Sequence, residues 1–153
     1  MKNILIFISI VLSTSHGNDT SKVVQTHKNG RVSIISYYHE TKEGLELFRQ
    51  ETFHFSGPKS MVGNYKNGIR DGDWTYWYEN GMKRLEGTYS NGFKNGLWTR
   101  WYGNGVTASK YTYDNTTFDG QVTDWHIDKE CWDNKGNPCE CGSSWWDDCE
   151  NHK

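Results

Sequence analysis

Between positions 63 and 110, the pattern of apolar and polar residues repeats with a period of 24 residues. From Gly63 the first copy is GNYKNGIRDGDWTYWYENGMKRLE, and from Gly87 the second copy is GTYSNGFKNGLWTRWYGNGVTASK. Eleven of the 24 positions are identical without a gap. The identical positions are Gly, Tyr, Asn, Trp and Thr, of which the aromatic residues and Thr favour strands and the Asn-Gly pairs favour tight hairpin turns. The pattern therefore predicts an array of β-hairpin repeats.

Each copy predicts one hairpin and one connecting loop. In the first copy we expect a strand over residues 73–78 and its return over residues 82–89. The hairpin turn falls at residues 79–81, where Gly81 accepts the positive φ that a tight turn requires. Residues 69–72 are predicted to be the loop that leads from one hairpin to the next.

Aromatic residues occupy the same places in successive copies. Alternation puts Trp74 and Tyr76 on one face of the sheet, and Thr75 and Trp77 on the other. The period predicts three aromatic columns, which are Trp77, Trp101 and Trp125; Tyr78, Tyr102 and His126; and Tyr65, Tyr89 and Tyr113. Because adjacent aromatic pairs contribute about 0.5–1.5 kcal/mol beyond the area they bury, such columns offset a small aliphatic core.

Weaker copies extend the array in both directions. Asn29-Gly30 is a strong hairpin signal, and Ser56-Gly57 falls 24 residues before Asn80-Gly81. These turns place one worn copy at about residues 29–62, and a second follows at about residues 111–130.

The repeats form one predicted domain over residues 18–130. Residues 31–39 are rich in β-branched and aromatic residues, and residues 45–55 also favour a strand. No linker rich in Pro or Ser interrupts residues 23–130. The predicted fold is all-β, an elongated antiparallel β-meander of stacked hairpin repeats.

The first 17 residues have the layout of a secretory signal peptide. A short basic start precedes an apolar run over residues 4–12, interrupted only by Ser9, and small polar residues follow. The run is too short to span a bilayer as a permanent helix. We therefore expect residues 1–17 to be removed and the protein to be periplasmic or secreted, without a membrane span. The alternative is a buried N-terminal strand.

The four cysteines, Cys131, Cys139, Cys141 and Cys149, all lie in the last 23 residues. In an oxidising compartment, an even count in a short tail predicts disulfides. Cys139 and Cys141 are too close to pair with each other. Two connectivities remain: Cys131 with Cys139 and Cys141 with Cys149, or Cys131 with Cys141 and Cys139 with Cys149. A four-cysteine zinc site is the competing interpretation, although such sites more often contain C-x2-C pairs.

The tail lacks the alternation of a strand, and we predict a disulfide-stapled cap over residues 131–153 that protects the open edge of the sheet. The composition agrees with a turn-rich β protein, because hydrophobic residues make up 34% of the chain, aromatic residues 15%, and Gly 16 of 153 residues. The formal net charge of −2 gives no electrostatic footprint for nucleic acid.

The motif Y-x-N-G-x-x-x-G-x-W-x-x-W-Y-x-N-G occurs over residues 65–81 and again over residues 89–105. It resembles the MORN-repeat variant family, and the segment CWDNKGN at residues 131–137 is similar to an ending found on secreted bacterial members. The resemblance implies that each repeat is a β-hairpin and that the hairpins stack into an elongated antiparallel sheet. Some members of the family are antitoxin or immunity components, which implies a possible role against a paired toxin.

Catalytic motifs are missing from the sequence. The histidines are scattered, and the chain contains no G-x-S-x-G, H-E-x-x-H or P-loop. Residues 133–137 resemble a fragment of a calcium loop but lack its terminal Glu, which favours a plain turn. We therefore expect no catalytic residues, no cofactor, no metal site and no enzymatic activity.

Binding is the function that the sequence favours. The candidate binding residues are aromatic or differ between copies, and they are Trp74, Tyr76, Trp98, Arg100, Tyr102 and His126. One sheet face exposes these aromatic rows, or alternatively the rings simply form the core of a thin sheet. Three functions follow: a scaffold that binds a protein partner, a glycan- or cell-wall-binding module, and an immunity protein against an exported toxin.

Overall fold

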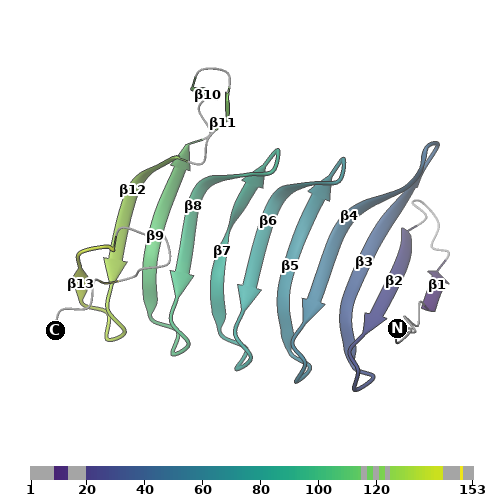
Figure 1. Ribbon diagram of the computed structural model, residues 1–153, viewed down its shortest axis with the longest axis horizontal. Coiled ribbons are helices and arrows are strands. Elements are labelled where there is room, and N and C mark those ends of the chain that lie inside the picture. The colour runs from purple at the N-terminus through teal and green to yellow at the C-terminus, as the bar shows by residue number, and fades with distance from the viewer. Residues whose placement is uncertain are drawn as a thin grey trace, which may run out of the picture.

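The structure is a computed structural model that describes residues 9–13, 20–114, 117–118, 121–122, 125–142 and 149. Across these residues it contains only strands and turns, and eleven strands form one sheet (Figure 1). In sheet order the strands are β1 (Ser9–Ser13), β2 (Thr20–Thr26), β3 (Val32–Thr41), β4 (Gly44–Phe53), β5 (Lys59–Lys66), β6 (Ile69–Trp77), β7 (Lys83–Ser90), β8 (Phe93–Trp101), β9 (Thr107–Asp114), β12 (Trp125–Trp132) and β13 (Pro138–Cys139).

Every neighbouring pair in this sheet is antiparallel, and the spatial order of the strands is their order in the sequence. The short strands β10 (Thr117–Phe118) and β11 (Gln121–Val122) form a separate pair, which projects beyond the upper edge of the sheet in Figure 1. The predicted all-β, elongated antiparallel meander is therefore confirmed.

At one end of the strands, five turns share the same hydrogen bonds. They lie at residues 27–31, 54–58, 78–82, 102–106 and 133–137. In each turn the first backbone N–H donates to the fifth carbonyl, and the glycine N–H donates to the first carbonyl. In the turn that begins at Tyr78, these distances are 2.9 and 3.0 Å. The turns predicted at Asn29-Gly30, Ser56-Gly57 and Asn80-Gly81 are confirmed.

The turns at the other end of the strands differ from one prediction. Residues 69–72 were expected to be a loop, but they begin strand β6. The turn lies earlier, at Asn67-Gly68, where both residues have positive φ, 52° and 73°. That combination is the one a two-residue type I′ hairpin turn requires. Asn91-Gly92 makes the same turn in the next copy.

The core of this single sheet is a Trp–Gly arrangement that occurs in both clear copies. The Trp74 indole lies on Gly63 of the adjacent strand, and the Trp98 indole lies on Gly87. A Cβ atom added to either glycine would fall 2.3 or 2.2 Å from the ring. Each indole N–H donates to a backbone carbonyl of the same neighbouring strand at 3.1 Å. Both Trp side chains are only 1% exposed.

Tyrosines fill the spaces between these indoles. Tyr89 packs edge-on against both Trp74 and Trp98, with ring centroids 5.5 and 4.9 Å apart, and Tyr65 packs edge-on against Trp74 at 5.3 Å. The rings therefore alternate Tyr and Trp, instead of stacking like on like as the columns predicted. The reason is spacing: strands lie about 4.8 Å apart, so equivalent residues two strands apart are too distant to touch.

The predicted columns also fail at their C-terminal end. Tyr78 Oη donates to Trp101 O at 2.8 Å, and Tyr102 Oη donates to Trp132 O at 2.9 Å. In the next copy, the position equivalent to Trp101 is therefore occupied by Trp132 and not by Trp125. The β10–β11 insertion lengthens the connection between β9 and β12, so a strict period of 24 no longer applies there.

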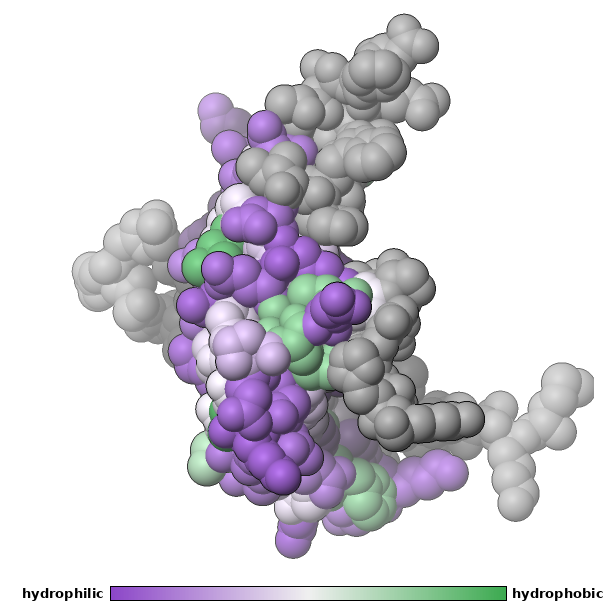
Figure 2. Space-filling model, turned by 90° about the vertical axis from the view of Figure 1, so that its left-hand side faces the viewer, coloured by the Kyte–Doolittle hydropathy of each residue, from purple (hydrophilic) through white to green (hydrophobic). Residues whose placement is uncertain are grey.

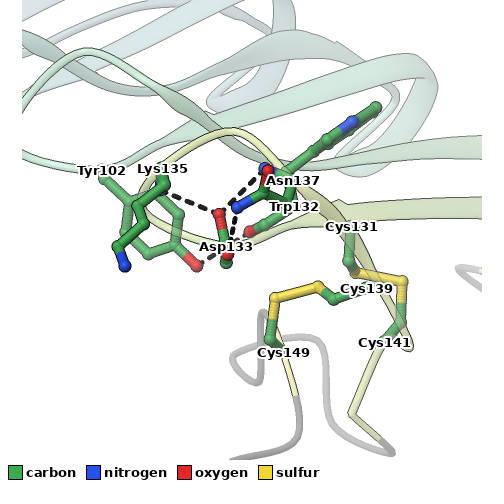
Figure 3. Close-up of a disulfide and its surroundings, with 9 residues drawn as sticks. All are labelled: Tyr102, Cys131, Trp132, Asp133, Lys135, Asn137, Cys139, Cys141 and Cys149. Carbon is green, nitrogen blue, oxygen red and sulfur yellow. Dashed lines mark hydrogen bonds between the residues drawn. A yellow bond between two sulfur atoms is a disulfide. The ribbon is translucent and has the colours of Figure 1, made fainter.

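Two disulfides fasten the C-terminal tail, Cys131 to Cys141 and Cys139 to Cys149 (Figure 3). This is the second of the two predicted connectivities, although Cys131 lies opposite Cys139 where β12 pairs with β13. Ala108 and Ser109 on β9 are fully buried, and Ser109 lies opposite Cys131 of β12. From the β12–β13 end the surface is mostly hydrophilic, with a small hydrophobic cluster near its middle (Figure 2).

Residues 9–13 of the predicted signal peptide form β1, which pairs with β2 through Ser9 opposite Val24. Removal of residues 1–17 stays a prediction. Among the described residues, no helix is long and apolar enough to cross a membrane.

We expect Gly87→Ala to lower the free energy of unfolding by about 1–3 kcal/mol, because the new methyl group overpacks against the buried Trp98 ring. Gly103→Ala is the matched control, since a Cβ atom there meets nothing within 4 Å. Urea unfolding followed by Trp fluorescence measures both variants. Equal unfolding midpoints would contradict the Trp–Gly packing.

Candidate functional site

A cavity of about 410 Å³ opens on the Trp–Gly face of the sheet, at the junction of the two clear copies. We call it the Tyr–Arg groove, and its lining residues are Arg70, Tyr76, Tyr78, Arg84, Leu85, Tyr89, Lys94 and Arg100. They come from three consecutive strands, β6, β7 and β8, and from the turn that starts at Tyr78.

Cross-strand pairing builds the floor of the groove. Tyr76 lies opposite Leu85, and Leu85 lies opposite Arg100, so the three side chains form one row across β6, β7 and β8. Residues paired in this way share a face of the sheet. Leu85 provides an apolar centre between a phenol and a guanidinium.

A β-bulge turns Arg84 into the groove. The pairing of β6 with β7 moves from Tyr76–Leu85 to Trp77–Lys83, which leaves Arg84 as the extra residue. Bulges of this kind re-aim a side chain. The Arg84 guanidinium consequently lies over the Tyr76 ring, with its Cζ 5.7 Å from the ring centroid.

Two further cations of the groove, Arg70 and Lys94, also lie against aromatic rings. Arg70 Cζ is 4.7 Å from the Trp74 ring centroid and 5.3 Å from that of Tyr89, and Arg70 Nη1 donates to Tyr89 Oη at 3.1 Å. Lys94 Nζ lies 4.9 Å from the ring centroids of both Trp98 and Tyr113. Cation–π contacts and hydrogen bonds thus position Arg70 and Lys94.

The groove is electropositive. Its described lining includes four cations, Arg70, Arg84, Lys94 and Arg100, and no carboxylate, although the whole chain has a net charge of −2. Burial, reinforced by the nearby Tyr89, raises the pKa of Tyr76 to about 12. Tyr76 is therefore a neutral hydrogen-bond donor at physiological pH.

The predicted binding residues on β6 and β8 divide between the groove and the core. Tyr76 and Arg100 line the groove, as a binding role requires. Trp74 and Trp98 are buried, which agrees with the alternative that their rings form the core of a thin sheet and not with an exposed row. The physical reason is that glycine on the neighbouring strand lets each indole lie flat on the backbone. Arg70 and Lys94 then cover the indoles.

Two of the predicted residues lie away from the groove. Tyr102 begins a turn and bonds to Trp132 O, as Figure 3 shows, and burial raises the pKa of its phenol. His126 belongs to β12 opposite Tyr113, and its side chain lies outside the described part of the structure. It does not follow Tyr102 in a column, because Asp133 begins the next equivalent turn.

Sequence reasoning missed several groove residues, namely Arg70, Tyr78, Arg84, Leu85, Tyr89 and Lys94. A signal for two of them was present, because a cation precedes the first Trp of both copies by four residues, as Arg70 before Trp74 and Lys94 before Trp98. Arg84 had no such signal, since its orientation depends on the bulge.

The calcium-loop fragment at residues 133–137 forms a plain turn, as predicted. The Asp133 carboxylate accepts hydrogen bonds from the Lys135 and Asn137 backbone N–H groups and from the Asn137 amide, at 2.8–2.9 Å. The Asn137 side chain is the main reason that the pKa of Asp133 is lowered. Among the described residues, no group of three or more His, Cys, Asp or Glu side chains is placed to hold a metal ion.

Comparison with known proteins finds no matching family model, no matching curated protein and no matching solved structure.

We expect Tyr76 to make stability depend on alkaline pH. Since its pKa is about 12 in the folded state and near 10 when unfolded, the unfolded state loses this proton first as pH rises. The contribution is intact below about pH 10 and is lost toward pH 12.

Urea unfolding of the wild type and of Tyr76→Phe, at several pH values through this window, checks the expectation. The free energy of unfolding should fall more steeply with pH in the wild type. Parallel pH profiles would contradict the assignment.

Proposed function

We propose that this protein is an exported, non-enzymatic repeat protein of the MORN-variant type, a scaffold that holds a protein partner through the Tyr–Arg groove. The observation that carries the proposal is the composition of the groove, in which three Tyr and three Arg surround Leu85. Tyr and Arg are enriched among the residues that dominate binding energy at protein interfaces. Seven of the eight residues that line the groove belong to strands of one continuous β-sheet, which favours a preorganised site.

The ring faces favour a protein partner over a glycan. Sugar rings stack on open aromatic faces, but Arg84 lies over Tyr76 and Arg70 lies over Tyr89. The indoles that were candidates for stacking are 1% exposed. A glycan- or cell-wall-binding module therefore has less support than a protein-binding scaffold.

Export is supported by two independent features, the predicted signal peptide and the two disulfides, which persist in oxidising compartments. Neutralisation of an exported toxin would be one form of this partner binding, and it rests on the MORN-variant resemblance.

Capture from the exported fraction of the native cells tests the proposal. The wild type should retain a specific partner, and Arg84→Glu with Arg100→Glu should reduce the retained amount by about tenfold or more, because a reversed charge repels what the groove attracts. Lys42→Glu with Lys66→Glu is the matched control, since both lysines are exposed and lie outside the groove.

Repeated capture experiments that retain no specific partner would contradict the proposal. A partner retained equally by the groove variant would show that another surface binds it.

A further inference from the structure

We propose that the Tyr–Arg groove recognises carboxylates, so that the partner presents an acidic segment in which Asp or Glu stands beside an apolar side chain. This inference rests on the proposed function and specifies the chemistry of the partner. The four cations that line the groove carry it, together with the apolar floor at Leu85.

The geometry separates two subsites. The apolar floor is Leu85, which lies opposite Tyr76 on the adjacent strand. Arg84 and Arg100 flank this floor, the first above Tyr76 and the second opposite Leu85. Guanidinium groups bind carboxylates through paired, charge-assisted hydrogen bonds. An apolar side chain on the floor would therefore place a neighbouring carboxylate near both guanidinium groups.

The opposite face of the same strands carries carboxylates. Asp73 and Thr75 pair with Thr88 and Glu86, and all four residues line a second cavity of about 310 Å³. Alternation along the strands thus places the Asp73 and Glu86 carboxylates on the face away from the groove, where Lys83 pairs with Glu86. The positive charge of the groove is consequently local, and an acidic segment would meet no carboxylate among the described lining residues.

The groove is specific to one junction of the array. Counting back and forward by one period, Arg84 corresponds to Ser60 and Ala108, and Arg100 corresponds to Tyr76. The preceding and following junctions thus lack the cation that the bulge turns inward. Recognition by charge is therefore expected at the junction of the two clear copies.

Fluorescence anisotropy with labelled synthetic peptides tests the inference on the full chain with both disulfides intact. The probe is a short peptide of Glu with interspersed Leu, and the matched peptide replaces every Glu with Gln. We expect the Glu peptide to bind about tenfold or more tightly than the Gln peptide, and to weaken as salt is added. Equal binding of the two peptides would overturn the inference.

Variants locate the binding site. Arg84→Gln should weaken the Glu peptide about tenfold, whereas Lys66→Gln, an exposed lysine outside the groove, should not change its affinity. Arg84 is exposed, so this variant should keep the fold, and near-UV circular dichroism checks that it does. Unchanged affinity in Arg84→Gln would overturn the assignment.

The same anisotropy measurement with a labelled oligogalacturonate shows whether the carboxylates come from a protein or from an acidic glycan. If the uronate oligomer binds more tightly than the Glu peptide, the ligand is an acidic glycan and the protein-segment inference fails. A different result would contradict the proposed function. A captured partner whose Glu-to-Gln replacements leave binding intact contradicts only this inference, whereas the lack of any captured partner contradicts the proposed function even if the peptide binds.

Discussion

The contact between each buried indole and a glycine of the neighbouring strand determines how a single sheet can have a core. A sheet with no second layer has no partner to cover its apolar side chains. Here Trp74 lies flat on Gly63, and its N–H group bonds to the same neighbouring strand. The indole thus becomes almost fully buried without a facing layer, because the adjacent backbone and a stacked cation enclose it.

The same contact positions the groove. Trp74 and Trp98 are buried against the neighbouring backbone. The cations that cover them, Arg70 and Lys94, therefore form part of the groove face. These cations then share a cavity with Tyr76 and Arg84. The residues that stabilise the fold and those that would contact a partner are consequently neighbours, which couples the shape of the groove to the packing beneath it.

The sequence predicted the hairpin array correctly because alternation and Asn-Gly turns are local signals. It left open or misplaced the features that depended on cross-strand register. The burial of Trp74 depends on which residue lies opposite, and the orientation of Arg84 depends on a bulge that no local pattern marks. His126 was placed in the wrong column because a fixed period cannot anticipate the β10–β11 insertion.

The order of the strands has a consequence for valency. Except where the separate β10–β11 pair lies between β9 and β12, each strand of the sheet pairs only with its neighbours in the sequence, so a hairpin completes its packing with the hairpins directly before and after it. In such one-dimensional arrays, stability is close to a sum of repeat and nearest-neighbour terms. The number of binding grooves is then set by the number of junctions carrying an inward cation, and a duplicated hairpin with Arg84 would add a second groove without a redesigned core.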